Sequence, residues 1–203
     1  MKSEYSAPVI WFCGLPGSGK TTIAKGVYER LVLDNPGTTI SLVSMDSIRK
    51  KIFPNPTYSD EERDAAYRCL VLVAGLLSKS GVVVIVDATA HKLIWRNLAR
   101  TEFKSSFIEV YVSCPVNVCI ERETMRTDNS DNIRKRLYLD ALERLKSGKK
   151  TDHLGKVPGV DEPFEESSVP DIVLDSEKSS PKELVESALQ GLKKLLPENF
   201  STN

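Results

Sequence analysis

The chain has 203 residues, of which 40% are hydrophobic and 28% are charged. This length and balance are typical of a globular protein that can bury a sizeable core. With 28 basic and 28 acidic side chains the formal net charge is zero, which argues against a surface for nucleic acids or for acidic membranes.

Compartment and redox state follow from two further observations. Residues 1–8 are polar and do not resemble a secretory signal, and no apolar run approaches the ~18 residues that a membrane span needs. The four cysteines match neither a zinc nor a disulfide spacing. We therefore expect a cytoplasmic protein whose cysteines are small buried hydrophobes, namely Cys13, Cys69, Cys114 and Cys119.

The first predicted strand, residues 9–13, ends at a glycine-rich turn that leads into a helix. Turn and helix start match the pattern G-x-x-x-x-G-K-[ST] in the required strand-then-helix context, and the backbone N–H groups of such a loop cradle phosphates. An ordinary glycine-rich turn is the alternative. Lys20 is expected to reach the β- and γ-phosphates of a nucleoside triphosphate, and the Thr21 hydroxyl is expected to ligate Mg²⁺. The predicted phosphate loop consists of Gly14, Leu15, Pro16, Gly17, Ser18, Gly19, Lys20, Thr21 and Thr22.

A helix over 21–33 and a second strand over 39–43 come next. Asp46 follows this strand closely. A carboxylate there can hold Mg²⁺ or accept a proton from an attacking hydroxyl, and the alternative is an N-cap for a short helix over 47–51. For Arg49, just behind it, we favour an anion contact over a solvated surface position.

Ser59 and Glu62 form a capping box that predicts a helix to about residue 79. Tyr58, directly before it, either stacks on a base or pins its loop. Arg63, in the first turns of the helix, is interpreted like Arg49, as a ligand for an anionic group.

Residues 82–86 are five consecutive β-branched side chains and predict a buried strand. The strand ends at Asp87. A carboxylate at this place suits Mg²⁺ or an ordered water beside the phosphate loop, whereas a turn or helix cap is the alternative.

The second half of the chain continues the alternation of helices and strands. Helices are predicted over 91–102, from Pro115 onward, over 133–146 and over about 181–196, and strands over 107–112 and 171–174. The helix that begins at Pro115 carries Arg122, and the C-terminal helix starts with a capping box. The charged segment 124–136 is predicted to be a mobile lid over bound nucleotide, and a solvated loop is the alternative.

Strands and helices alternate along the whole chain without a repeat or a long linker. The alternation predicts a single α/β domain over 1–203, with about five parallel strands and helices on both faces of the sheet. Ligands of such sheets bind at the carboxyl ends of the strands. Gly14, Asp46, Asp87 and Cys114-Pro115 all fall at those ends, so we expect them to converge on one cleft.

Residues 11–24 closely resemble the opening of the adenylylsulfate kinase family, whose members phosphorylate the 3′-hydroxyl of adenosine 5′-phosphosulfate (APS) with ATP. The resemblance spans about residues 9–175. Its further matches are Asp46-Ser47-Ile48-Arg49, Tyr58-Ser59, Glu62-Arg63, Glu109-Val110-Tyr111-Val112, Cys114-Pro115, Arg122-Glu123 and Gly159-Val160-Asp161.

The resemblance implies a P-loop NTPase fold, with ATP and Mg²⁺ as cofactors. It implies Asp46 and Lys20 as catalytic residues and Thr21 as a metal ligand, while Asp87 is expected as a second metal ligand from its place at the end of its strand. Arg122 joins the phosphate loop on the nucleotide side. The acceptor side is formed by Arg49, Tyr58, Arg63 and Val157, where Val157 replaces an aromatic residue that would cover the adenine.

Several departures from the family pattern fall on the acceptor side. Ala66 stands where an asparagine is expected, and Thr89-Ala90-His91 replaces I-S-P, while Asp87 is an acid that the family often lacks. APS is therefore the best acceptor hypothesis, and another nucleotide-linked or sugar acceptor is the alternative. A non-catalytic nucleotide-binding module is a remote third, since the guanine motif N-K-x-D is absent. A small-molecule partner is expected, and a homodimer is left open.

Overall fold

The computed structural model describes residues 7–125, 137–147, 155–196 and 200. The predicted lid over 124–136 lies largely outside these residues and stays a prediction. The described elements, in chain order, are β1 (Val9–Cys13), α1 (Lys20–Asp34), β2 (Ile40–Ser44), α2 (Met45–Ile52), α3 (Asp60–Lys79), β3 (Val83–Asp87), α4 (Leu93–Phe103), a 3₁₀ turn (Lys104–Ser106), β4 (Phe107–Ser113), α5 (Val116–Thr124), α6 (Leu137–Ser147), β5 (Ile172–Asp175) and α7 (Pro181–Lys193).

The five strands form one parallel sheet in the order β2-β3-β1-β4-β5. This confirms the predicted α/β class and the parallel sheet of about five strands. In this register Asp87 at the end of β3 pairs with Phe12 of β1 on one side and with Ser44 of β2 on the other. The ends of these three strands therefore meet at one edge, as the sequence predicts.

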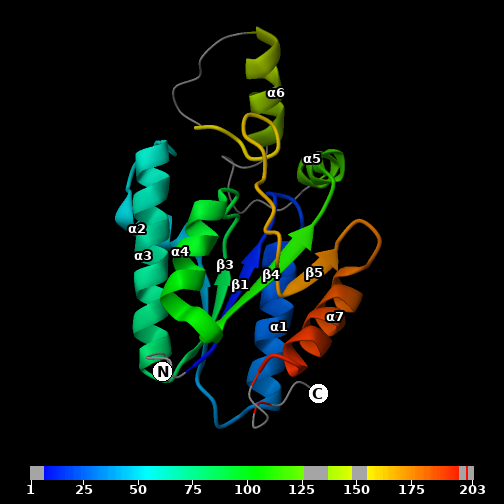
Figure 1. The fold of residues 1–203 in the computed structure, drawn as a ribbon. Helices are drawn as coiled ribbons and strands as arrows, with labels where there is room; N and C mark the ends of the chain where they lie inside the picture. The colour runs from blue at the N-terminus through cyan, green and yellow to red at the C-terminus, as the bar shows by residue number, and fades with distance from the viewer. Residues whose placement is uncertain (1–6, 126–136, 148–154, 197–199, 201–203) are drawn as a thin grey trace.

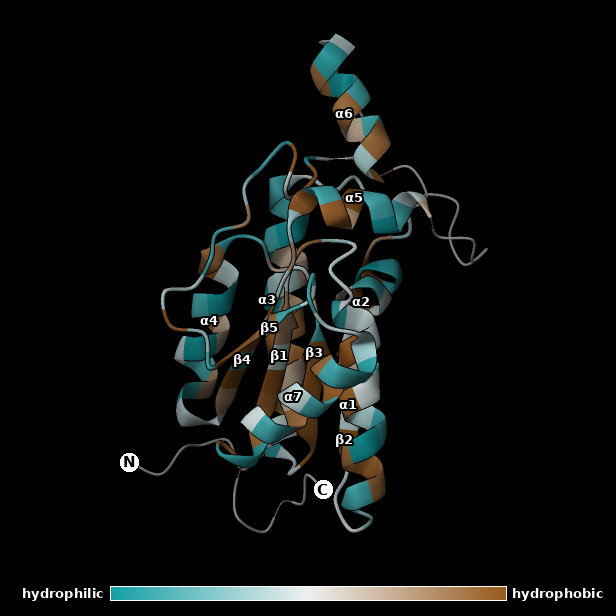
Figure 2. Cartoon of the chain, turned by 90° about the vertical axis from the view of Figure 1, so that its right-hand side faces the viewer, coloured by the Kyte–Doolittle hydropathy of each residue, from teal (hydrophilic) through white to brown (hydrophobic). Residues whose placement is uncertain are grey.

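Helices cover both faces of the sheet, with α1 and α7 on one face and α3 and α4 on the other (Figure 1). Successive β1 residues supply both cores, because Ile10 and Phe12 pack toward α1 and α7 while Trp11 packs toward α3 and α4. Figure 2 shows the resulting apolar centre, with brown strands in the middle and helices that carry both hydrophilic and hydrophobic bands. Since neither face meets water, the strand is an unbroken apolar run.

Most predicted elements are confirmed to within two residues at their ends. The C-terminal helix stops at Lys193, three residues earlier than predicted. A separate short helix, α2, starts at Met45 with Ser44 as its N-cap. Asp46 therefore lies in the first turn of this helix, and the alternative in which Asp46 is the cap is wrong.

The two predicted capping boxes have different outcomes. At α7 the box is complete, because Ser180 accepts from the Glu183 N–H and the Glu183 carboxylate accepts from the Ser180 N–H. At α3 the Ser59 side chain accepts from the Glu62 N–H at 3.2 Å, as predicted. The Glu62 carboxylate, however, accepts from the Tyr58 N–H at 3.0 Å, so this half of the box is wrong. The chain turns at Tyr58, whose φ is +57°, and this turn brings the preceding N–H groups to Glu62.

All four cysteines are free thiols, and three of them are buried, while Cys69 is partly exposed. Among the described helices, none combines the length and the apolar character needed to cross a membrane.

Candidate active site

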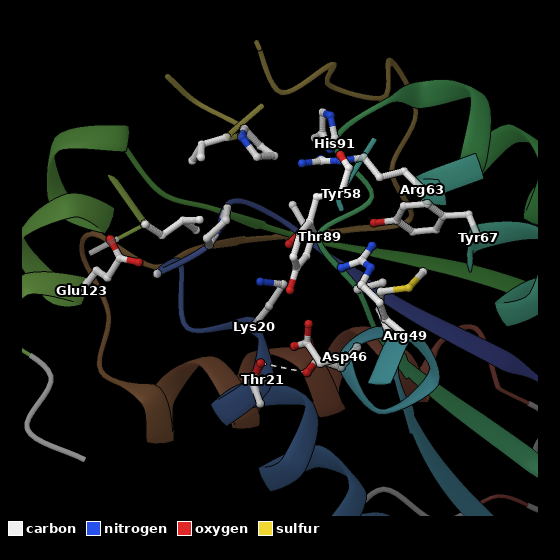
Figure 3. A pocket seen from close by; sticks show the side chains of 18 of the residues that line it. Lys20, Thr21, Asp46, Arg49, Tyr58, Arg63, Tyr67, Thr89, His91 and Glu123 are labelled. Atoms are coloured by element: carbon white, nitrogen blue, oxygen red, sulfur yellow. Dashed lines mark hydrogen bonds between the residues drawn. The ribbon is translucent and has the colours of Figure 1, made fainter. Parts of the chain in front are cut away.

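A pocket opens at the carboxyl edge of the sheet, above the ends of β1, β2 and β3 (Figure 3). Its walls come from the loop between β1 and α1, the start of α2, the residues around the start of α3, the segment after β3, and residues 156–158. These segments are far apart in the sequence. The sheet register brings them together, which confirms the predicted convergence for Asp46 and Asp87, whereas Gly14 and Cys114-Pro115, predicted to join the same cleft, do not line the pocket.

The loop between β1 and α1 is tightly built against its neighbours. Gly17 has a φ of +82°, and a Cβ there would lie 2.6 Å from the backbone oxygen of Cys119, so a side chain does not fit. α1 begins at Lys20, which directs the positive end of the helix dipole into the pocket. Of the predicted loop residues, six line the pocket: Pro16, Gly17, Gly19, Lys20, Thr21 and Thr22. Gly14, Leu15 and Ser18 lie behind them.

Two outer contacts hold this loop in place. The Tyr138 hydroxyl donates to the Pro16 carbonyl at 2.8 Å, and the Ser176 hydroxyl donates to the Ser18 carbonyl at 2.6 Å. Arg122 in turn donates to the Ser176 hydroxyl at 2.7 Å. Arg122 is predicted to contact nucleotide, but here it does not line the pocket, and its guanidinium supports the loop from outside through Ser176.

Two acidic side chains stand over the start of α1. The Thr21 hydroxyl donates to Asp87 Oδ2 at 2.8 Å, the dashed line in Figure 3. Asp87 is buried, and its Oδ1 has no hydrogen-bond partner among the described residues. Asp46, from the first turn of α2, lines the same pocket. The structure thus brings together the residues predicted to act on Mg²⁺ and on the attacking hydroxyl.

These oxygens suit Mg²⁺. A buried carboxylate oxygen without a partner is costly to keep, and it is the hard ligand that Mg²⁺ prefers. Within the described part of the chain, no three His, Cys, Asp or Glu side chains form a closed metal cage. This agrees with Mg²⁺ sites of kinases, where one or two protein ligands are completed by phosphate oxygens and water.

The opposite wall carries the predicted acceptor residues. The guanidinium of Arg49 lies 4.8 Å from the centre of the Tyr58 ring and 3.7 Å from Glu62 Oε1. Arg63 donates from Nε to the Tyr58 carbonyl at 2.9 Å and from its terminal nitrogen to the Lys156 carbonyl. Arg63 thereby joins the start of α3 to the loop around residue 156, with part of its side chain still on the pocket wall.

The loop that begins at Gly155 closes this wall. Gly155 has a φ of +43°, and a Cβ there would lie 2.6 Å from the Tyr58 Cβ, so only glycine allows this approach. Arg144 of α6 donates to the Gly155 carbonyl at 3.0 Å and to Asp161 at 2.8 Å. Val157 lines the pocket while packing almost fully buried among apolar neighbours.

Comparison with known proteins identifies the family. The sequence model of the adenylylsulphate kinase family matches residues 6–175. A probable adenylyl-sulfate kinase from Archaeoglobus fulgidus is 34% identical over 171 residues, which are 84% of this chain and 97% of that protein. The adenylyl-sulfate kinase of Deinococcus deserti is 31% identical, and the match covers 93% of this chain and 88% of that one. The chain belongs to the adenylylsulphate kinase family.

A solved structure agrees with this assignment. The APS kinase of Mycobacterium tuberculosis in complex with AMPPNP and APS is 27% identical, with a TM-score of 0.71, over 93% of this chain and 99% of that one. The family, the P-loop NTPase fold and the kinase class predicted from the sequence are confirmed.

Some residues of this adenylylsulphate kinase site are not among the residues predicted from the sequence. Thr89 and His91 reach the pocket because they follow β3 at the carboxyl edge, the same reason that Asp87 does. Tyr67 lies one helical turn beyond Arg63, so the i+4 spacing is the signal that could have found it. Glu123, Leu137, Lys156 and Pro158 complete the walls.

His91 is buried, and its Nε2 lies 2.8 Å from Glu162 Oε2. Burial lowers the pKa of His91 to about 4, although the hydrogen bond to Glu162 acts in the opposite direction. His91 is therefore neutral at physiological pH and serves the pocket wall as a hydrogen-bonding group without a charge.

Proposed function

We propose that this kinase transfers the γ-phosphoryl group of ATP to the 3′-hydroxyl of APS. The observation that carries the proposal is one continuous pocket with two chemically distinct walls. One wall offers Lys20, Thr21 and the start of a helix, which suit a triphosphate. The other offers Arg49, Arg63 and the Tyr58 ring, which suit an anion attached to an aromatic base.

On the nucleotide side, Lys20 and the N–H groups at the start of α1 bind the β- and γ-phosphates. Thr21 and Asp87 would hold Mg²⁺, because Asp87 Oδ1 has no hydrogen-bond partner among the described residues and is a suitable ligand for the ion. When bound, Mg²⁺ supplies positive charge against the charge that develops on the phosphate oxygens. As ADP leaves, Lys20 stabilises the negative charge on it.

Asp46 orients the acceptor hydroxyl and takes its proton. The hydroxyl oxygen bonds to the γ-phosphorus while the bond from that phosphorus to the β,γ-bridging oxygen breaks. The proton passes to the Asp46 carboxylate, and ADP carries away the bonding electrons. Asp46 and Lys20 line the same pocket, so the base and the phosphate-binding cation face one reaction centre (Figure 3).

On the acceptor side, Arg49 and Arg63 bind the anionic phosphosulfate. Tyr58 contacts the adenine, and Val157 lines the same pocket. Support comes from the bound ligands of the M. tuberculosis APS kinase, an ATP analogue and APS together, in a protein that this chain matches over 93% of its length.

A second candidate is the same transfer to another nucleotide-linked or sugar hydroxyl. Ala66 favours it, because this buried methyl group does not line the pocket and cannot replace the polar asparagine that the family pattern carries there.

A coupled assay of ADP formation with a panel of acceptors separates the two candidates. The proposal expects Mg²⁺-dependent turnover of APS, with a phosphorylated 3′ position in the product. Turnover of another acceptor from the panel, with none of APS, would show that the proposed acceptor is wrong and the second candidate right.

A further inference from the structure

Tyr67 is a polar side chain of the acceptor wall that the proposed function leaves without a role. It lies on α3 four residues after Arg63, on the same face of the helix. Only 3% of it is exposed, and it lines the pocket together with Arg49, Asp46 and Arg63. Figure 3 shows its hydroxyl end directed away from α3 and into the pocket.

The ring is held firmly in this direction. It stacks on Trp95 with the ring centres 4.1 Å apart and the planes 16° from parallel. The edge of Trp95 in turn meets His91, with ring centres 5.1 Å apart. A stacked aromatic side chain has little freedom to rotate, so the position of the Tyr67 hydroxyl is set before any ligand binds.

The Tyr67 hydroxyl can accept one hydrogen bond and donate another, and in the part of the chain that the structure describes only its acceptor function is used. Its oxygen accepts from the Ala90 N–H at 2.6 Å. Ala90 has a φ of +43°, so this bond helps to hold a strained segment between β3 and α4. A tyrosine hydroxyl also carries one hydrogen to donate, and no acceptor for that hydrogen lies among the described residues.

The charges around the hydroxyl favour an anionic acceptor for this hydrogen. Burial raises the pKa of Tyr67 to about 12 and Asp46 acts in the same direction, although the bond from Ala90 and the charges of Arg49 and Arg63 act to lower it, so the hydroxyl keeps its proton at neutral pH. A protonated phenol beside two guanidinium groups is a donor site for oxygens that carry negative charge.

We propose that Tyr67 is a specificity-determining residue of the acceptor wall, whose hydroxyl donates a hydrogen bond to the anionic group bound by Arg49 and Arg63. The inference rests on the proposed function, since that function places the anion of the acceptor at this wall. In this proposal the Tyr67 hydroxyl is a neutral donor, held in place by its contacts with Ala90 and Trp95, that acts beside the two cationic donors Arg49 and Arg63.

The test replaces the hydroxyl and keeps the ring, as Tyr67→Phe. Because a hydrogen bond to a charged group is lost, KM for the acceptor is expected to rise about tenfold or more. KM for ATP is expected to change by less than about twofold, because the lost donor does not face the phosphate loop. The matched control is Tyr111→Phe, since Tyr111 also stacks on an aromatic ring and donates at 3.0 Å to Glu166, but outside the pocket.

A purely structural role for Tyr67 would look different. Loss of the bond to Ala90 would disturb the segment whose Thr89 carbonyl accepts from the Gly14 N–H of the phosphate loop. KM for ATP and KM for the acceptor would then rise together, with a lower melting temperature, and the inference would be overturned. Unchanged kinetics in Tyr67→Phe would overturn it as well.

Two further arms complete the experiment. If Tyr67→Phe does not fold, 3-fluorotyrosine at position 67 is used in its place, because it keeps both hydrogen bonds and makes the hydroxyl a stronger donor. KM for the acceptor is then expected to shift at least twofold. An unchanged KM would contradict the inference. If the unmodified protein turns over another acceptor but not APS, the proposed acceptor is wrong, and the same comparison is made with the acceptor that reacts. An unchanged KM for that acceptor overturns the inference on Tyr67.

Discussion

Asp46 and Asp87 stand at the same sheet edge but in different surroundings. Asp87 is the last residue of β3, is 5% exposed and already accepts the Thr21 hydroxyl hydrogen. Asp46 projects from the first turn of α2 beside the acceptor wall. From these positions we infer a division of roles, in which Asp87 acts with Thr21 on the metal and Asp46 acts on the hydroxyl that loses its proton.

Asp46→Asn tests this division. The amide cannot accept the proton, so kcat is expected to fall by about 10² to 10⁴, the usual contribution of a general base, with KM for ATP nearly unchanged. The comparison is Asp87→Asn, which keeps an oxygen for Thr21 but loses the charge, and which is expected to raise the Mg²⁺ concentration for half-maximal rate. Steady-state rates over an Mg²⁺ titration measure both effects. If Asp46→Asn instead shifted only the Mg²⁺ requirement, Asp46 would be a metal ligand.

At the scale of elements, the start of α6 is tied to the phosphate loop. The Tyr138 hydroxyl donates to the Pro16 carbonyl at 2.8 Å, and the Tyr138 N–H donates to Glu123 Oε2 at 3.1 Å. Tyr138 is fully buried, so its ring cannot easily turn away. One side chain thus connects the end of α5, the start of α6 and the loop that binds phosphates.

Tyr138→Phe is expected to loosen that loop. A net loss of about 0.5–1.5 kcal/mol for one neutral hydrogen bond predicts a rise of about two- to tenfold in KM for ATP. KM for the acceptor should stay unchanged, because Tyr138 does not touch that wall. Initial-rate kinetics give both values, and Tyr28→Phe, on the core side of α1, is the control for loss of a hydroxyl. Equal changes in both KM values would contradict the assignment to the nucleotide side.

The elements with strong local signals could be predicted from the sequence. The run of β-branched residues predicts β3, and the glycine pattern that ends at Lys20 predicts the turn between β1 and α1. α2 enters the sequence analysis only as the alternative for Asp46, because eight residues are too few for a firm helical pattern, and the bond from Tyr58 to Glu62 is not predicted because it depends on a left-handed residue. Tyr67 and His91 have local signals, namely the i+4 spacing from Arg63 and the place after β3, but which wall of the pocket each of them lines depends on tertiary packing.

At the scale of the whole molecule, one buried arginine connects three parts of the fold. Arg96 of α4 is fully buried, with its Nε 3.0 Å from Glu109 Oε1 of β4. Its terminal nitrogens donate to the carbonyls of Ala90, in the segment after β3, and of Glu165, in the loop that follows the acceptor wall. Arg96 therefore fixes the pocket segments to the sheet without touching the pocket.

Arg96→Met removes one partner of this buried pair. Breaking such a pair costs about 3–5 kcal/mol, and we expect a value near the lower end because Arg100 still contacts Glu109 at 2.9 Å. The control is Arg68→Met, whose exposed pair with Asp64 predicts a change below about 1 kcal/mol. Urea unfolding measures the free energy of both variants. Equal stability of the two variants would mean that the buried pair contributes no more than a surface pair.

His91 predicts how the stability of the molecule depends on pH. Its pKa is lowered to about 4 by burial, against about 6.5 in an unfolded chain, and it lies among Glu162, Lys92 and Arg63. Between pH 6.5 and 4 the unfolded chain therefore binds a proton at this histidine that the native state does not bind. The stabilisation is fully present above pH 6.5 and is lost as the pH falls toward 4, by at most about 1.4 kcal/mol per pH unit.

The measurement is urea unfolding of the natural protein and of His91→Gln at pH 7, 6 and 5. Glutamine keeps a hydrogen-bonding group for Glu162 but does not titrate, so the natural protein should lose more of its free energy of unfolding on acidification than the variant does. The difference isolates this one residue, because all other titrating groups are shared. Parallel pH profiles would show that His91 takes up its proton in the native state over the same pH range as in the unfolded chain, and its contact with Glu162 would then become an ion pair below about pH 6.5.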